Sequence, residues 1–273
     1  MYDWQRMPVS CTLSPRPISK EDFARLDYEV TRLAFESQND FGRLCDETIY
    51  ENDLAVRIEA AGLGPVRKQL PLTITHKSFR KTYYLDLVVA DAAVYELKTA
   101  TTLVNDHDTQ LLNYLYLWNA EHGKLLNFRS AKVESRFVNN PLKPESRKRF
   151  TAKLEKWRET DTQSKILRET FLGLLGDWGA FLEIPLYTEA LVHFLGGEQC
   201  IVHPVPLSRN GVFLGNQRMP LLAPDLAFCI TSLTLGAAHY ERHLSSLLRY
   251  SPIRRFQWIN LDQHEIHFIT WPQ

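Results

Sequence analysis

The sequence predicts a mixed α/β domain over its first half. Apolar residues recur at helical spacing between residues 20 and 60, and the period changes to two between residues 70 and 100. One more helical segment and two short strands follow before residue 140. The expected order is helix, helix, three strands, helix and two strands, which is typical of a sheet flanked by helices.

The two N-terminal helices have recognisable beginnings and ends. Ser19 and Asp22 form an approximate capping box before an apolar stripe that starts at Phe23. A second helix is expected over residues 46–60, with Ile49, Leu54 and Ile58 on its buried side. A glycine-containing segment ends it.

The strands follow from alternation. Leu70, Leu72 and Ile74 alternate with polar residues, and TYYLDLVVA and AAVYELKTA then indicate two strands around Asp91. HDTQLLNYLYLWNA restores the helical period, and KLLNF and KVESRFV indicate two further strands. We therefore expect a β-hairpin centred on Asp91.

The composition excludes several classes of protein. The 273 residues include 32 basic and 32 acidic side chains, which argues against a protein that holds nucleic acid through overall basicity. No window resembles a membrane span or a signal peptide. The four cysteines are scattered and form no CxxC pair. We expect a cytoplasmic protein with reduced thiols.

Length and charge suggest two domains and a joint. Residues 141–170 hold nine basic and five acidic side chains. The expected parts are an N-terminal arm at 1–18, the α/β domain at 19–140, a basic helical connector at 141–170 and a second domain at 171–273. In the connector Arg147, Lys148 and Arg149 are candidate contacts for nucleic acid, although a solvated helix face has the same composition.

The expected hairpin brings two acids together. If it is centred on Asp91, antiparallel partners have numbers that sum to 182, and Asp86 faces Glu96. Opposed carboxylates repel each other unless a cation lies between them. Lys98 projects from the same face because side chains alternate along a strand. The patch fits Mg²⁺-assisted phosphodiester hydrolysis, although a solvated sheet edge with an acid–lysine pair shows the same pattern.

The surrounding segments resemble a known family. FGRLCDETIY, YYLDLVVADAAVYELKTA and HDTQLLNYLYLWNAEHGKLLNF are together similar to the GxxExxY family of the PD-(D/E)XK nuclease superfamily, over roughly residues 20–140. The resemblance implies a restriction-endonuclease-like core with a mixed central sheet flanked by helices. One position departs: Leu44 stands where the family has the glycine three residues before its helical glutamate, although Gly42 is present.

The resemblance also implies roles for single residues. Those matched to the metal site are Glu47, Asp86 and Glu96. Those matched to catalysis are Asp86, Glu96, Lys98 and Gln110. Tyr114, which with Gln110 matches the QxxxY helix motif of RecB-like members, is expected with Lys98 at the nucleic acid. The implied cofactor is Mg²⁺, which Mn²⁺ can replace.

Residues 171–273 repeat this order in shortened form. The paired positions are Glu183 with Glu47, Tyr187 with Tyr50, Asp225 with Asp86 and Asn260 with Asn127. Counting back from the last pair, Glu96, Lys98 and Gln110 fall on Cys229, Thr231 and His243. We therefore expect a duplicated fold whose second copy is a degenerate, inactive nuclease-like domain. The alternative is that the similarity is coincidental, because any two α/β segments with the same order of helices and strands can be aligned.

Two rival hypotheses stay open. Cys200, His203, His239 and His243 have spacings that zinc ligands use, so the second half is alternatively a zinc-stabilised domain. The main prediction is an Mg²⁺-dependent nuclease, with DNA favoured over RNA as substrate. Its rival is an inactive nuclease-fold module that binds nucleic acid or, through residues 171–273, a protein partner. No membrane contact is expected, and the oligomeric state is left open.

Overall fold

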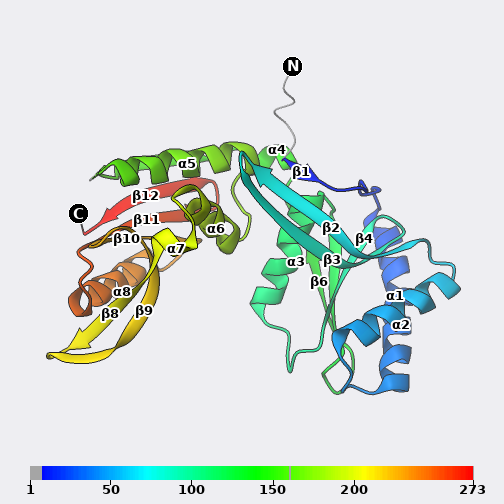
Figure 1. Cartoon of the computed structure of the whole chain (residues 1–273). Helices are drawn as coiled ribbons and strands as arrows, with labels where there is room; N and C mark the ends of the chain where they lie inside the picture. The colour runs from blue at the N-terminus through cyan, green and yellow to red at the C-terminus, as the bar shows by residue number, and fades with distance from the viewer. Residues whose placement is uncertain (1–7, 160, 273) are drawn as a thin grey trace. The chain divides into compact units, whose positions relative to one another are not determined.

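The chain folds into two compact units. The computed structural model describes residues 8–159 and 161–272, so the first seven residues of the expected N-terminal arm lie outside the described part. The first unit is Met1–Pro144 and the second is Glu145–Gln273, and each is built on one six-stranded sheet (Figure 1). In the described part of the chain, no helix combines the length and apolar character needed to cross a membrane.

The first unit contains the expected order of helices and strands, preceded by one short strand. Its elements are β1 (Val9–Ser10), α1 (Lys20–Phe41), α2 (Glu47–Ala60), β2 (Val66–His76), β3 (Phe79–Val89), β4 (Ala93–Lys98), α3 (Asn105–Trp118), β5 (His122–Asn127) and β6 (Glu134–Asn139). The sheet order is β1-β2-β3-β4-β5-β6. Only β4 and β5 are parallel, because α3 crosses over between them. The sheet is therefore mixed, as the fold class predicts.

Helices α1 and α2 begin close to where the sequence predicts. The Ser19 hydroxyl accepts a hydrogen bond from the Asp22 backbone N–H at 3.1 Å, which caps α1. In α2, Leu54 is fully buried, but Ile49 is 44% exposed, so the predicted burial of Ile49 is wrong. Tyr50 is buried in its place, because it lies one helical turn before Leu54 and shares its face.

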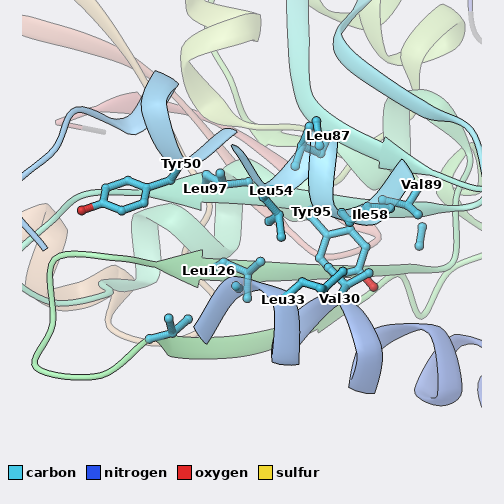
Figure 2. Packing of buried hydrophobic residues seen from close by; sticks show 14 of the residues in the cluster. Val30, Leu33, Tyr50, Leu54, Ile58, Leu87, Val89, Tyr95, Leu97 and Leu126 are labelled. Atoms are coloured by element: carbon cyan, nitrogen blue, oxygen red, sulfur yellow. The ribbon is translucent and has the colours of Figure 1, made fainter. Parts of the chain in front are cut away.

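The core of the first unit lies between these two helices and one face of the sheet (Figure 2). Side chains alternate along β3 and β4, so Leu87, Tyr95 and Leu97 point toward the helices. The labelled members of this cluster are Val30, Leu33, Tyr50, Leu54, Ile58, Leu87, Val89, Tyr95, Leu97 and Leu126. By the same alternation Glu96, between Tyr95 and Leu97, projects from the opposite face.

Helix α3 covers that opposite face (Figure 1), where it contacts β2, β5 and β6. Gly123 in β5 allows the close approach. A Cβ atom at this position would lie 3.1 Å from a methyl group of Leu111 and 3.2 Å from one of Leu115. Helix α3 is therefore packed closely against β5.

The β3–β4 hairpin has the predicted register. Leu87 pairs with Tyr95 and Val89 with Ala93, so the partner numbers sum to 182. Asp91 lies in the turn with φ of 54°, in the left-handed region that aspartate tolerates at tight turns.

The second unit repeats this connectivity. Its elements are α4 (Pro144–Arg147), β7 (Thr151–Lys156), α5 (Thr162–Trp178), α6 (Ile184–Phe194), α7 (Glu198–Ile201), β8 (Val202–Arg209), β9 (Val212–Ala223), β10 (Leu226–Thr231), α8 (Ala237–Tyr250), β11 (Arg255–Asp262) and β12 (Glu265–Trp271). The sheet order is β7-β12-β11-β10-β9-β8. From β8 to β12 the pairings are antiparallel, antiparallel, parallel and antiparallel, as they are from β2 to β6.

Residues 141–170 do not form the predicted basic helical connector. They contain α4, strand β7 and the first part of α5. Strand β7 pairs in parallel with β12 at the edge of the second sheet. The local composition favoured a polar helix, but the open edge of β12 provides backbone partners that only the folded sheet supplies, and exposed lysines are common on such edges.

Candidate active site

The predicted acidic pair lies where β3 and β4 separate. The ladder between the strands ends at Leu87 and Tyr95, one rung before Asp86 and Glu96. Beyond the last rung, Oδ2 of Asp86 accepts a hydrogen bond from the backbone N–H of Leu97 at 2.8 Å. The carboxylate of Asp86 thus replaces the backbone carbonyl that would accept this bond in a regular ladder. This bond holds Asp86 where the two strands separate.

Glu96 and Lys98 form an ion pair beside it. Lys98 Nζ lies 2.6 Å from Oε1 of Glu96, and the two side chains are 14% and 2% exposed. The other oxygen, Oε2 of Glu96, is buried and has no hydrogen-bond partner among the described residues. Because a buried carboxylate oxygen without a partner is unfavourable, a cation or a donor at this point would be stabilised.

Burial sets the protonation of these groups. Desolvation, aided by the charge of Asp86, raises the pKa of Glu96 to about 8, although Lys98 opposes the shift. Desolvation also raises the pKa of Asp86. For Lys98, desolvation acts to lower the pKa, but the neighbouring carboxylates, Glu96 first, outweigh it and raise the pKa above its usual value. The raised pKa means that Lys98 is a cation at neutral pH.

Two glutamates of α2 approach the pair. Glu47, in the first turn, is half-buried; desolvation raises its pKa, Lys98 opposes this and Asp86 adds to it. Glu51 is 7% exposed. Desolvation and the charge of Asp86 raise its pKa, although a hydrogen bond from Gln69 acts against them. Glu51 was not among the predicted site residues; its spacing of four from Glu47, which places both on one helical face, was the available signal.

Gln69 of β2 connects these acids. Its Nε2 donates a hydrogen bond to Oε2 of Glu51 at 2.6 Å and another to Oδ1 of Asp86 at 3.1 Å. Gln69 was not predicted either, because a single glutamine in a strand has no spacing that distinguishes it from a solvated residue.

Gln110 and Tyr114 share one face of α3, as predicted. Gln110 Nε2 donates a hydrogen bond to the Tyr114 hydroxyl at 2.9 Å. Tyr114 is 7% exposed, and its ring packs edge-on against Tyr83 of β3 with centroids 5.7 Å apart. This packing attaches α3 to the sheet, and the roles of both residues toward a substrate stay predictions.

Arg147, Lys148 and Arg149, the basic run predicted to contact nucleic acid, differ in their exposure to solvent. Arg147 is 2% exposed, which contradicts its predicted contact with nucleic acid. Its backbone carbonyl lies so close to Gly179 that a Cβ atom there would be 2.7 Å away, so the segment is packed into the second unit. Lys148 is half-buried and Arg149 is exposed. All three belong to the second unit, whereas the carboxylates belong to the first.

Two asparagines, one in each unit, make the same backbone contacts and so identify β5 and β11 as corresponding strands. Asn127 at the end of β5 accepts from the backbone N–H of Ala100 at 3.1 Å and donates to its carbonyl at 2.8 Å. Asn260 in β11 makes the same two bonds with Leu233, at 2.8 and 2.9 Å. Each asparagine thereby holds the segment that follows the central strand of its sheet.

The carboxylates and the lysine have no counterparts in the second unit. Lys98 is the β4 residue paired with the first of these asparagines, and Thr231 is the β10 residue paired with the second. Two residues earlier, Cys229 takes the place of Glu96. Burial raises the pKa of Cys229 to about 12, so it is a neutral thiol. Continuing the β9–β10 register places Met219 opposite it, where the first unit has an aspartate.

Two predicted equivalences between the halves are displaced. Glu183 caps α6 at the position that Asp46 holds before α2, so it does not correspond to Glu47. Asp225 lies in the β9–β10 turn, as Asp91 lies in the β3–β4 turn, and not within a strand as predicted. The physical reason is that turns and helix starts shift register by a residue or more without changing the apolar pattern of the segments between them.

The alternative zinc ligands are not brought together. His203 Nε2 lies 2.9 Å from the backbone carbonyl of Cys200, and the His239 and His243 rings contact each other on α8. Across residues 8–159 and 161–272, no three or more His, Cys, Asp and Glu side chains converge as ligands of one metal ion.

Asp86 and Glu96 nevertheless fit a divalent cation in chemistry and burial. They supply hard oxygen atoms, and the unpartnered Oε2 of Glu96 is an atom that a cation would satisfy. Glu47 is close enough for its charge to act on Asp86, but these three acids are not gathered around one point. The residues that would hold the cation are therefore Asp86 and Glu96, with water completing the coordination.

Comparison with known proteins supports the nuclease class. Residues 24–138 match the model of a family described as PD-(D/E)XK nuclease superfamily. The mixed sheet flanked by helices agrees with that fold, and two sheets of one connectivity fit a duplicated arrangement. No curated protein matches the chain. A solved structure described as "Crystal structure of SSO0001" is 18% identical, with 45% of this chain and 77% of that chain covered and a TM-score of 0.28.

Proposed function

We propose that the first unit is a metal-dependent nuclease that hydrolyses phosphodiester bonds, with Mg²⁺ as its cation and Mn²⁺ as a substitute. One observation carries the proposal. Glu96 is buried with Oε1 bonded to Lys98 and Oε2 without a partner among the described residues, directly beyond the rung at which Asp86 leaves the ladder. The match of residues 24–138 to the nuclease superfamily supports it.

The side chains divide the work between them. A divalent cation held by Asp86 and Glu96 would lower the pKa of a bound water and offset charge on the phosphate. Lys98 holds one oxygen of Glu96, so its positive charge is fixed beside the carboxylates, where it would stabilise the negative charge of the transition state. Glu47 adds negative charge that favours cation binding.

DNA is the substrate we propose ahead of RNA, on the family resemblance of the first unit. The whole chain carries equal numbers of basic and acidic residues, so its attraction for phosphate rests on local groups and on the cation. Half-buried Lys148 and exposed Arg149 of the second unit are the remaining candidate contacts from the basic run.

The second unit is, in this proposal, an inactive copy of the first. It has the same strand connectivity and the same asparagine contacts, but Met219, Cys229 and Thr231 stand where the first unit has its carboxylate pair and lysine. Without charged groups there it cannot hold the cation. Its role is then to extend the surface for nucleic acid or to bind a protein partner.

A cleavage assay on the full chain tests the nuclease proposal. Single- and double-stranded DNA and RNA would be incubated with Mg²⁺, with Mn²⁺ and with EDTA. Lys98→Ala is the test variant, and Lys153→Ala is the matched control, because Lys153 is also a strand lysine in an acid–lysine pair but lies in the second unit. We expect cation-dependent cleavage that Lys98→Ala abolishes and Lys153→Ala retains.

Two outcomes would overturn it. One is the absence of cation-dependent cleavage on all four substrates, and the other is cleavage that survives Lys98→Ala. Salt-sensitive binding without cleavage would favour a nucleic-acid-binding module, because phosphate contacts release counterions and weaken as salt rises.

A further inference from the structure

The pairing of β2 with β3 is interrupted at a single rung. The pairs run from Val66 to His76 with partner numbers that sum to 155, and the missing pair is Gln69 with Asp86. Gln69 has φ of 50°, a left-handed conformation that is uncommon for a residue other than glycine and unfavourable within a strand. Regular pairing is thus lost at the residue that faces a carboxylate of the site.

The side chain of Gln69 compensates for this strain. Its amide nitrogen carries two hydrogens, and it donates to Glu51 at 2.6 Å and to Asp86 at 3.1 Å. The two acids are 7% and 9% exposed and repel each other. Hydrogen bonds to ionised acceptors are among the stronger ones, so a neutral amide holds two like charges side by side without adding a charge of its own.

The second unit provides an internal comparison. There His203 of β8 pairs regularly with Met219 of β9, the position that corresponds to Asp86. His203 is not among the residues with positive φ, and its ring nitrogen contacts the carbonyl of Cys200. The interrupted rung therefore accompanies the carboxylates and is not a requirement of the fold.

We propose that Gln69 is a positioning residue of the site, which holds Glu51 beside Asp86 so that the negative charge of Glu51 adds to the charge around the divalent cation without Glu51 being one of its ligands. This inference rests on the proposed function. Without the amide, repulsion would move Glu51 away from Asp86, and the cation would be surrounded by less negative charge.

Direct measurement of Mn²⁺ binding to the full chain tests this role independently of cleavage. Gln69→Met keeps the length of the side chain and removes both donors. We expect Mn²⁺ to bind about tenfold more weakly, since the lost bonds are charge-assisted. Gln217→Met is the matched control, an exposed glutamine of β9 in the second unit, and should leave the affinity unchanged.

A second readout separates positioning from damage to the fold. In Gln69→Met, the rate of cleavage at low Mn²⁺ should fall and should recover when the Mn²⁺ concentration is raised about tenfold, whereas a misfolded unit would not recover. In a Glu51→Gln background, Gln69→Met should weaken Mn²⁺ binding by clearly less than tenfold, because the partner through which it acts has lost its charge.

Unchanged Mn²⁺ affinity in a folded Gln69→Met variant would overturn the inference, and so would a full tenfold loss that does not depend on Glu51. The two proposals fail differently. Mn²⁺ binding without cleavage in the wild type overturns the nuclease and leaves Gln69 testable by affinity. Cleavage with an unaffected Gln69→Met overturns only the role of Gln69.

Discussion

Tyr50 and Tyr187 occupy the same position in the two units. Each hydroxyl donates a hydrogen bond to the carbonyl of the glycine eight residues earlier, Gly42 at 2.7 Å and Gly179 at 2.6 Å. Both tyrosines are fully buried, and desolvation raises the pKa of both hydroxyls, so they remain donors. The bond attaches α2 to the C-terminal cap of α1 in the first unit, and α6 to the C-terminal cap of α5 in the second.

This shared bond predicts a matched loss of stability. Tyr50→Phe and Tyr187→Phe keep the rings but remove the hydroxyl that donates to the glycine carbonyl, and each should destabilise its own unit by about 1 kcal/mol. Urea unfolding of the full chain, followed by a probe in each unit, would measure it. A loss confined to one of the two variants would contradict the equivalence of the two positions.

From the Glu96–Lys98 pair we predict that substitutions can restore stability without restoring cleavage. Lys98→Met should lower cleavage by a factor of about 10²–10³, because it removes a fixed charge near the phosphate. It should also destabilise the first unit, since Glu96 is left buried without its partner. The double variant Glu96→Gln with Lys98→Met should regain stability and stay inactive. Paired measurements of cleavage rate and urea midpoint test this, and regained cleavage in the double variant would contradict it.

The shifted pKa of Glu96 predicts how stability changes with pH when metal is removed by EDTA. Its ordinary value is 4.5 and its value in the fold is about 8, so between these pH values the folded state keeps a proton that the unfolded state has released. The stability contributed by Glu96 is therefore complete below the unfolded pKa and is lost as pH rises through about 8.

This loss of stability is on the order of a few kcal/mol at most, because the ion pair with Lys98 and relaxation of the surroundings both reduce the cost of ionising buried Glu96. Glu96→Gln cannot titrate, so its stability should fall less steeply than that of the wild type between about pH 4.5 and pH 8. Unfolding midpoints at each pH give the comparison. Identical slopes for the two proteins would show that Glu96 is ionised in the fold throughout this range.

The two asparagine contacts predict different effects on activity. Asn127→Ala removes both bonds to Ala100 and should loosen the segment after Lys98, so cleavage should fall along with stability. Asn260→Ala should destabilise the second unit by a similar amount, about 1–3 kcal/mol, and leave cleavage unchanged, because that unit lacks the charged residues of the site. Cleavage rates of the two variants, measured under conditions in which both are folded, test this difference. Equal losses of cleavage would contradict the proposal that the second unit is inactive.

The register of the central hairpin was predictable because it depends on local features. The turn at Asp91 sets the strand partners, so the pairing of Leu87 with Tyr95 and of Val89 with Ala93 follows from the sequence. The start of α1 at Ser19 was predictable for the same reason, since a cap involves neighbours in sequence.

The burial of single residues was less predictable. Arg147 lies in a basic run and has the composition of a surface segment, yet it is buried in the second unit. Ile49 is apolar and lies in a helix, yet it is exposed. In both cases the packing of neighbouring elements decides which residues are covered, and the local pattern does not contain that information.

What the sequence determined by itself is the order of the helices and strands between residues 19 and 140 and the register of the β3–β4 hairpin, because periods of two and 3.6 are properties of neighbouring residues. Only the tertiary structure decided that Gln69 joins Glu51 to Asp86 across 18 and 17 positions of the chain and that β7 completes the second sheet. Such contacts between distant residues depend on which strand edges and buried charges meet when the elements pack.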